Sequence, residues 1–142
     1  MAEPRTVAIC LIRHQGKILV GEASDAVKGE TFYRPLGGGV NFGESARNAV
    51  IREIKEEIGA ELANVRQLSV IENIFTYQGN PGHEIIFVFE AEFADKSLYA
   101  RSEWDTSTEP GWSRFLWKPE SVFHTGAEKL YPEGLLDCVK EA

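Results

Sequence analysis

Three glutamates, Glu53, Glu56 and Glu57, are spaced so that they would share one stripe of a helix. At about 100° per residue, the three side chains fall within about 100° of one another. Carboxylates on one stripe repel each other, and no argument from stability places them there. A hard divalent cation with oxygen ligands removes that repulsion, and such cations serve phosphate chemistry. The stripe therefore predicts a site for Mg²⁺, which Mn²⁺ could also fill.

A run of glycines precedes this helix and adds to the prediction. Gly37, Gly38 and Gly39 allow the backbone to approach a ligand closely, and Arg52 lies four residues before Glu56, where it could orient a carboxylate. Each feature alone has a plainer explanation. A Glu-rich helix with interleaved Lys and Arg is usually a solvated face, and a glycine run is usually only a turn. Their combination favours a functional site.

The same stretch resembles the Nudix box of the Nudix hydrolases. Gly38 is followed after five residues by Glu44, and after seven more by residues 52–59 (REIKEEIG). Seven fixed residues at fixed spacing have a chance probability on the order of 10⁻⁸ per start position. Two positions depart from the usual pattern, because Ala60 replaces a large aliphatic residue and Leu36 separates Pro35 from the glycines. Neither position carries a carboxylate, so the departures concern the shape of the loop.

The resemblance implies a metal-binding role for residues of the box. Glu53 and Glu57 correspond to the principal metal ligands, and Glu56 to a further ligand or to the base that activates water. The backbone carbonyl of Gly37 corresponds to the ligand that is not a carboxylate. The reaction implied is substitution by water at phosphorus.

The resemblance also implies supporting residues. Arg52 would orient a box glutamate, and Glu44 would support the site from the loop. An acid from outside the box often contributes in this family, and Glu109 is favoured over Glu103 because it lies nearer the strand that begins at Trp112. An ordinary solvated loop acid is the alternative for both residues.

The expected enzyme is a Mg²⁺-dependent pyrophosphohydrolase that cleaves a phosphoanhydride bond in a nucleoside diphosphate linked to another moiety. A nucleoside triphosphate and a dinucleoside polyphosphate both fit this description. Tyr77 lies 17 residues after Ala60, where a tyrosine resembles the marker of dinucleoside-polyphosphate hydrolases. Arg34 could meet a phosphate. Tyr77 is equally an ordinary strand aromatic, and Arg34 an ordinary surface residue.

Other classes of protein remain as alternatives. A Nudix-fold sensor that binds a nucleotide without hydrolysing it would tend to lose box glutamates, and none is lost here. An isomerase on the same fold would want further Cys, His or Glu residues around a metal, and Cys10 and Cys138 stand in apolar or amphipathic surroundings. A structural module, in which the glutamate stripe is only surface, would bind no metal.

The elements that must position these residues follow from hydrophobic periodicity. Val50, Ile54 and Ile58 predict a helix over residues 45–58, with Ser45 suited to begin it and Gly59 to end it. A shorter helix is expected at 132–141, a long loop at 95–110, and a turn at 78–83. Strands are expected at 6–13, 17–23, 31–36, 65–77, 84–93 and 112–117. The pattern predicts an α/β (α+β) fold, a Nudix-type α/β/α sandwich with a mixed sheet, in a single domain over residues 1–142.

Composition limits the partners. The formal net charge is −7, which argues against nucleic-acid binding through a basic surface. No apolar run reaches the ~20 residues of a membrane span, and the N-terminus lacks the pattern of a secretory signal. The two cysteines are too few for a disulfide framework and are expected as reduced thiols. We expect a cytoplasmic protein, monomeric or homodimeric, that acts on a small nucleotide-type diphosphate.

Overall fold

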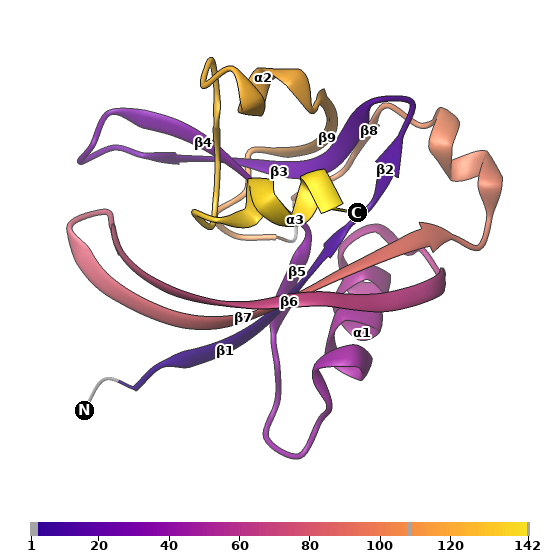
Figure 1. Ribbon diagram of the computed structural model, residues 1–142, viewed down its shortest axis with the longest axis horizontal. Helices are drawn as coiled ribbons and strands as arrows, with labels where there is room; N and C mark the ends of the chain where they lie inside the picture. The colour runs from indigo at the N-terminus through magenta and orange to yellow at the C-terminus, as the bar shows by residue number, and fades with distance from the viewer. Residues whose placement is uncertain (1–2, 108, 142) are drawn as a thin grey trace.

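The computed structural model describes residues 3–107 and 109–141, which form two β-sheets and their covering helices (Figure 1). The strands are β1 (Arg5–Leu11), β2 (Arg13–His14), β3 (Lys17–Asp25), β4 (Glu30–Pro35), β5 (Gly37–Gly39), β6 (Leu62–Tyr77), β7 (Asn80–Phe93), β8 (Glu103–Trp104), β9 (Arg114–Pro119) and β10 (Lys129–Leu130). The helices are α1 (Ala46–Ile58), a 3₁₀ helix η1 (Lys96–Ala100), α2 (Ser121–His124) and α3 (Leu135–Glu141).

Both sheets are mixed. The first has the order β5-β1-β7-β6, and the second has the order β10-β4-β3-β9-β8, with β2 paired to β3. Strands β1 and β7 are parallel, as are β4 and β10, whereas the other pairs are antiparallel. The predicted mixed α+β architecture is therefore confirmed, with the strands divided between two sheets.

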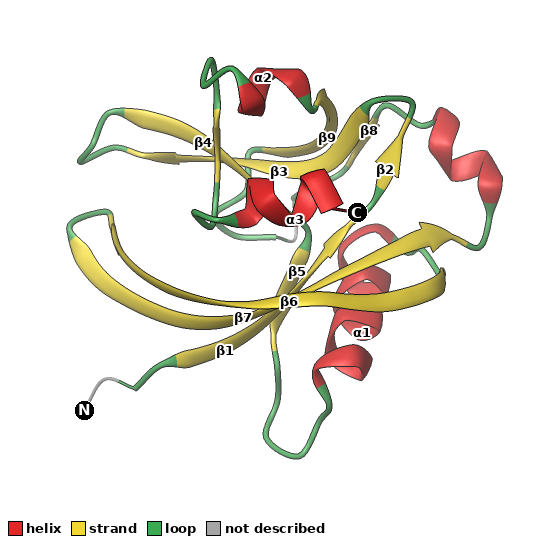
Figure 2. Ribbon diagram, viewed as in Figure 1, coloured by secondary structure: helices red, strands yellow, loops and turns green. Residues whose placement is uncertain are grey.

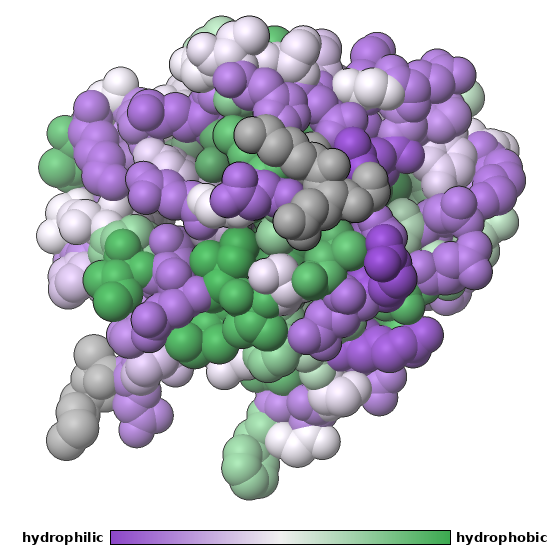
Figure 3. All heavy atoms as spheres, in the orientation of Figure 1, coloured by the Kyte–Doolittle hydropathy of each residue, from purple (hydrophilic) through white to green (hydrophobic). Residues whose placement is uncertain are grey.

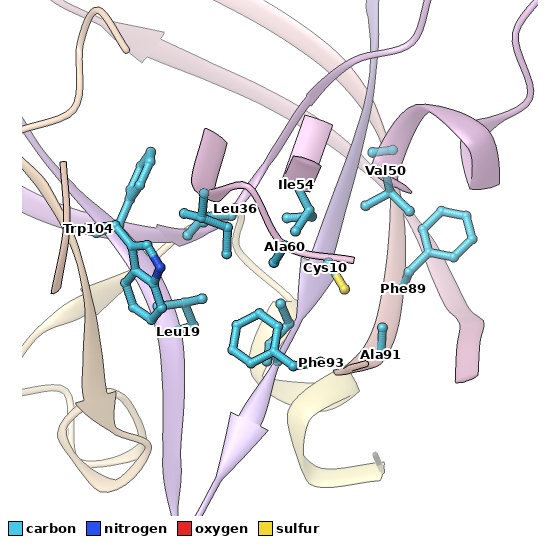
Figure 4. Close-up of a cluster of buried hydrophobic side chains, with 14 of the residues drawn as sticks. Cys10, Leu19, Leu36, Val50, Ile54, Ala60, Phe89, Ala91, Phe93 and Trp104 are labelled. Atoms are coloured by element: carbon cyan, nitrogen blue, oxygen red, sulfur yellow. The ribbon is translucent and has the colours of Figure 1, made fainter. Parts of the chain in front are cut away.

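Two hydrophobic cores lie on opposite faces of the strands. Successive side chains of a strand point to opposite faces, so Val7 and Ile9 of β1 join the core that includes Leu135 of α3. Ala8 and Cys10 join the other core, which packs against α1 (Figure 4). Helices thus cover both faces, which is the predicted α/β/α sandwich. β1 is buried on both sides, and this explains why it reads as an unbroken apolar run.

Helix α1 begins and ends where the sequence predicts. The side chain of Ser45 accepts a hydrogen bond of 3.1 Å from the Asn48 N–H, which satisfies a free backbone donor of the first turn. Gly59 adopts the left-handed conformation at φ 69° and donates its N–H to the Lys55 carbonyl at 2.9 Å. Val50 and Ile54 are fully buried, so the packed side of the helix fixes the direction of its glutamates.

The predicted loop over residues 95–110 was wrong in part. It contains η1 and β8, whose Trp104 is buried and pairs with Phe115 of β9. Helix α2 and strand β10 were also missed. These elements have two to five residues each, which is too short for periodicity to reveal. The turn predicted at 78–83 is shorter, because β7 begins at Asn80.

Hairpins β3–β4 and β6–β7 project on the same side of the molecule, at the left of Figures 1 and 2. Their tips are joined by Gln78, whose backbone N–H donates to Asp25 at 3.1 Å and whose side-chain oxygen accepts from the Ala26 N–H at 3.0 Å. The tips are therefore held together over the space between the sheets. Figure 3 shows hydrophilic residues over most of the molecule's visible face and a hydrophobic patch over the middle of β6. In the described part of the chain, no helix has the length and apolar character needed to cross a membrane.

Candidate active site

A cavity of about 590 Å³ lies between the two hairpins and the start of the glycine run. It brings together eight residues that the sequence singled out: Arg34, Gly37, Gly38, Gly39, Glu53, Glu57, Tyr77 and Glu109. Arg52 adjoins this lining through hydrogen bonds to Glu53 and Gly39, and it connects Glu44 and Glu56 to the site. Residues far apart in the sequence, from β4, α1, β6 and the loop before β9, therefore face one space.

Glu57 is the most deeply placed acid of the helix stripe, with only 7% of its surface exposed. Its Oε1 atom is buried and has no hydrogen-bond partner among the described residues. Burial, followed by the charges of Glu53 and Glu109, raises the pKa of Glu57 to about 9, against opposing contributions from Arg34 and the Gly37 backbone. An anionic Glu57 is thus costly unless a cation joins it.

The glycines make room for the acids. A side chain on Gly38 would place its Cβ 2.5 Å from the carboxylate of Glu53, and one on Gly37 would place it 2.0 Å from the Ala8 carbonyl oxygen. Both contacts are impossible for any other residue without movement of the backbone or of Glu53. The glycine run is therefore required for Glu53 to reach the cavity, and it does more than form a turn.

Arg52 connects the helix to the loop before it. Its Nε and Nη2 donate to the two oxygens of Glu44 at 2.8 and 2.9 Å, and Nη2 also donates to the Gly39 carbonyl at 2.9 Å. Its Nη1 donates to Glu53 at 2.9 Å and to Glu56 at 3.3 Å. Hydrogen bonding to Arg52 lowers the pKa of Glu44 to about 2. Glu56 remains largely exposed at the rim of the site.

The loop before β9 brings Glu109 to the site and leaves Glu103 outside it. Glu109 lines the cavity, and burial together with the charges of Glu53 and Glu56 raises its pKa. Glu103 instead lies on β8, where its carboxylate is 3.5 Å from Arg114. Of the two acids, Glu109, which the sequence favoured, is the one that faces the acids of the box.

Two arginines flank a buried acid on the opposite wall. Glu84 of β7 is 7% exposed and lies 3.7 Å from Nη1 of Arg34 and 3.6 Å from Nη1 of Arg5. The guanidinium of Arg34 lies 5.2 Å from the ring centroid of Trp112, and burial lowers the pKa of Arg34. Its Nε is buried without a hydrogen-bond partner in the described chain. The sequence analysis did not identify Glu84. Its position directly before the apolar residues of β7 could have indicated a buried acid.

Aromatic side chains form the far end of the cavity. The ring of Phe32 lies 5.9 Å from that of Tyr77, edge to face, and 5.3 Å from that of Tyr131. The Tyr77 hydroxyl donates to the Ser24 carbonyl at 3.3 Å, and 36% of the residue is exposed. Tyr77 thus has the contacts of an ordinary strand aromatic and also a free surface towards the cavity.

The tryptophans and His83 divide between the site and other parts of the molecule. Trp112 lines the cavity. Trp104 and Trp117 pack against the ring of Phe93 instead. His83 forms a hydrogen bond of 3.1 Å with the exposed Glu72, along the β6–β7 hairpin.

The carboxylates fit a divalent cation by their chemistry. Among residues 3–107 and 109–141, no group of three or more His, Cys, Asp or Glu side chains is already gathered closely enough to hold a metal ion. Glu57 nevertheless presents a buried oxygen without a partner, beside Glu53 and Glu109, whose charges raise its pKa. A cation there would satisfy that oxygen and relieve the repulsion among the acids, and oxygen ligands are those that Mg²⁺ prefers.

Comparison with known proteins gives one family. The family model described as the NUDIX domain matches residues 2–120. The NAD-capped RNA hydrolase NudC of Pseudomonas aeruginosa is 28% identical over 95 residues, which cover 67% of this chain and 31% of that protein. The chain thus spans about a third of the length of the curated relatives that it matches.

Solved structures show the same fold. A NUDIX hydrolase from Nitrosomonas europaea superposes with a TM-score of 0.69 at 17% identity, covering 97% of this chain and 87% of that one. A MutT NUDIX hydrolase from Burkholderia pseudomallei gives a TM-score of 0.63 at 25% identity, covering 84% of this chain and 86% of that one. Helix α1, the glycine run and the two sheets therefore belong to a fold already seen in this family.

Proposed function

The chain belongs to the Nudix family of hydrolases, which act on diphosphate bonds and generally use divalent metal ions, and we propose that it is a Mg²⁺-dependent pyrophosphohydrolase. Its substrate on this proposal is a small nucleotide-type molecule in which a diphosphate joins a nucleoside to another group. Water attacks one phosphorus, the phosphoanhydride bond breaks, and two phosphate-bearing products leave.

A pair of buried atoms carries this proposal. Glu57 and Arg34 line one cavity, and Oε1 of the acid and Nε of the arginine are both buried without a hydrogen-bond partner among the described residues. Buried polar atoms are normally satisfied, so such exceptions indicate a missing ligand. A cation on Glu57 and a phosphate oxygen on Arg34 would satisfy both atoms. A metal-bound diphosphate supplies the two together.

The residues of α1 and the glycine run would hold the cation. We assign Glu53, Glu57 and the carbonyl of Gly37 as ligands, with Glu56 at the rim as a further ligand. Bound Mg²⁺ would polarise the phosphoryl oxygens and make the attacking water more acidic. Arg52 fixes the carboxylate of Glu53 through its 2.9 Å hydrogen bond.

Glu109 is the residue that we assign to accept the proton of the attacking water. It faces the acids of the box from another segment, and its raised pKa makes its carboxylate a stronger base than an ordinary solvated glutamate. On the opposite side, Arg34 would bind a non-bridging phosphate oxygen and stabilise the charge that develops there.

The aromatic end of the cavity supports a nucleoside in the substrate. Phe32, Tyr77 and Tyr131 provide aromatic surface in the wall of the cavity, where a base could stack. The Pseudomonas relatives are named for a substrate in which a diphosphate joins two nucleosides, and the same linkage would place one nucleoside at this end. An acidic protein of net charge −7 suits a small nucleotide better than a polynucleotide.

A panel of substrates tests the proposal. ADP-ribose, NADH, diadenosine tetraphosphate and nucleoside triphosphates would be compared, with AMP as the monophosphate control, and release of phosphate products would be measured with Mg²⁺ and with EDTA. We expect hydrolysis of at least one diphosphate, none of AMP, and loss of activity in EDTA that Mg²⁺ or Mn²⁺ restores. Full turnover in excess EDTA would contradict the assignment. Tight binding of a nucleotide without hydrolysis would indicate a sensor instead.

A further inference from the structure

Glu84 occupies an unusual position between the two sheets. On β7 it stands opposite Arg5 of β1 in the parallel register, and its other carboxylate oxygen reaches Arg34 of β4, which belongs to the second sheet. The residue is 7% exposed, whereas its partner Arg5 has a largely exposed side chain. Glu84 is thus the buried acid through which Arg34 is joined to the first sheet.

Arg34 has a competing partner close by. Arg34 and Glu57 line the same cavity, and the charge of each residue affects the pKa of the other. Nε of Arg34 and Oε1 of Glu57 are both buried and lack hydrogen-bond partners in the described chain, and a buried polar atom without a partner is unfavourable. A direct ion pair between Arg34 and Glu57 would satisfy both atoms. It would also occupy the oxygen that a metal ion needs.

We propose that Glu84 is a positioning residue that holds the guanidinium of Arg34 away from Glu57. The two residues then remain available for different ligands, Glu57 for a divalent cation and Arg34 for a phosphate oxygen. The 3.7 Å ion pair between Glu84 and Arg34 supplies the alternative anion that makes this separation possible. This inference rests on the proposed metal-dependent function, since it concerns how the metal site is kept open.

Mn²⁺ binding, measured as loss of the free-ion signal in electron paramagnetic resonance, tests the inference without any substrate. In Glu84→Gln, Arg34 would turn to Glu57, and the affinity for Mn²⁺ should fall about tenfold, as is common when a residue supporting a metal ligand is lost. The double variant Glu84→Gln/Arg34→Gln removes the competing guanidinium. The affinity of this double variant for Mn²⁺ should lie within about threefold of the wild-type affinity.

Loss of the negative charge of Glu84 could by itself lower the affinity for Mn²⁺. A second double variant with the same net charge as the first tests this explanation. Glu84→Gln/Arg5→Gln has the same net charge as the rescuing double variant, but the largely exposed side chain of Arg5 pairs with Glu84 and with none of the acids of α1. We expect no recovery in this variant. Equal recovery with either arginine replaced would show a through-space effect of charge and would overturn the positioning role.

Glu90→Gln is the matched control, because Glu90 lies on the same face of the same strand and pairs with the exposed Arg66. It should leave Mn²⁺ affinity unchanged. Glu84→Asp serves if the Gln variant fails to fold, since the shorter side chain keeps the charge but withdraws from Arg34, and it should weaken Mn²⁺ binding in part. Unchanged affinity in a folded Glu84 variant would overturn this inference alone. Absence of Mn²⁺ binding in the wild-type protein would overturn the proposed function with it.

Discussion

Arg52 donates two hydrogen bonds of 2.8 and 2.9 Å to Glu44, one to each carboxylate oxygen. The same guanidinium holds the carbonyl of Gly39 and the carboxylate of Glu53. One side chain therefore joins the loop, the glycine run and the helix stripe. The planar, forked geometry of arginine makes this arrangement possible, and an ammonium group cannot reproduce it.

Arg52→Lys should therefore lower kcat/KM by about tenfold or more, because Glu53 loses the group that orients it. The positive charge is kept, so a fall reflects geometry. Steady-state kinetics with saturating Mg²⁺ would measure the effect. Arg47→Lys, an exposed position on the same helix, is the control and should be neutral. Wild-type kinetics in Arg52→Lys would show that Glu53 is oriented by the glycine run alone.

Glu57→Gln should abolish turnover without weakening the fold of the metal-free protein. The amide resembles the protonated acid, which is the form that burial and the neighbouring acids favour at neutral pH. Thermal melting should show a midpoint in EDTA at least as high as that of the wild-type protein, and no rise on addition of Mg²⁺. A strongly lowered midpoint in EDTA would mean that the charge of Glu57 is structural.

The raised pKa of Glu57 also sets a pH dependence. Its ordinary value is 4.5 and its folded value is about 9, so the folded state retains a proton that the unfolded state has lost between these values. This contribution to stability is complete below about pH 4.5 and is lost as the pH rises towards 9. Metal-free protein should therefore lose stability over that window, and added Mg²⁺ should oppose the loss.

Binding of the metal must then release a proton at pH 7, because a carboxylate ligand has to be ionised. Titration calorimetry with Mn²⁺ in buffers of different ionisation enthalpy would count the protons. We expect about one released per chain from Glu57. Glu57→Gln should remove most of this release. No dependence on the buffer in the wild-type protein would contradict a protonated Glu57.

The helix and its stripe could be predicted from the sequence because their causes are local. Ser45 and Gly59 are the residues that begin and end α1, and the spacing of Val50 and Ile54 fixes which side is buried. Once that side is known, the direction of the glutamates follows from 3.6 residues per turn. The role of Arg52 in orienting box glutamates was also accessible, from its spacing to Glu56.

The opposite wall of the cavity could not be predicted in the same way. Glu84, Arg34 and Arg5 meet only because β1 pairs with β7 in the first sheet, while β4 lies in the second. No periodicity within one segment encodes that meeting. The choice between Glu103 and Glu109 likewise depended on β8, a two-residue strand that turns Glu103 towards Arg114.

Glu109→Gln should lower kcat by at least about tenfold, which corresponds to about 1.4 kcal/mol of transition-state stabilisation. The amide keeps the shape of the side chain but cannot accept the proton of the attacking water. KM and Mn²⁺ affinity should change less than kcat, because the substitution leaves Glu53 and Glu57 in place. Glu103→Gln is the control and should behave as wild type. If kcat fell in Glu103→Gln and not in Glu109→Gln, Glu103 would be the base.

The last prediction concerns the group attached to the diphosphate. Tyr77 closes the aromatic end of the cavity, and its ring packs edge to face on Phe32. If a nucleobase stacks there, Tyr77→Ala should raise KM about tenfold for substrates with a nucleoside at this end, since base–aromatic stacking contributes about 1–3 kcal/mol. The value of kcat should change little, which is the pattern of binding lost equally from the ground and transition states.

Tyr77→Phe separates stacking from structure. It removes the hydrogen bond from the hydroxyl to the Ser24 carbonyl but keeps the ring, so KM should stay near the wild-type value while the melting midpoint falls slightly. Comparison of NADH with inorganic pyrophosphate gives a second control, because pyrophosphate has no base and its KM should not respond to Tyr77→Ala. An unchanged KM for NADH in Tyr77→Ala would assign the residue to the hairpin alone. An equal rise in KM for NADH and pyrophosphate would indicate that the substitution displaces Phe32. A loss of stacking would affect only the substrate that has a base.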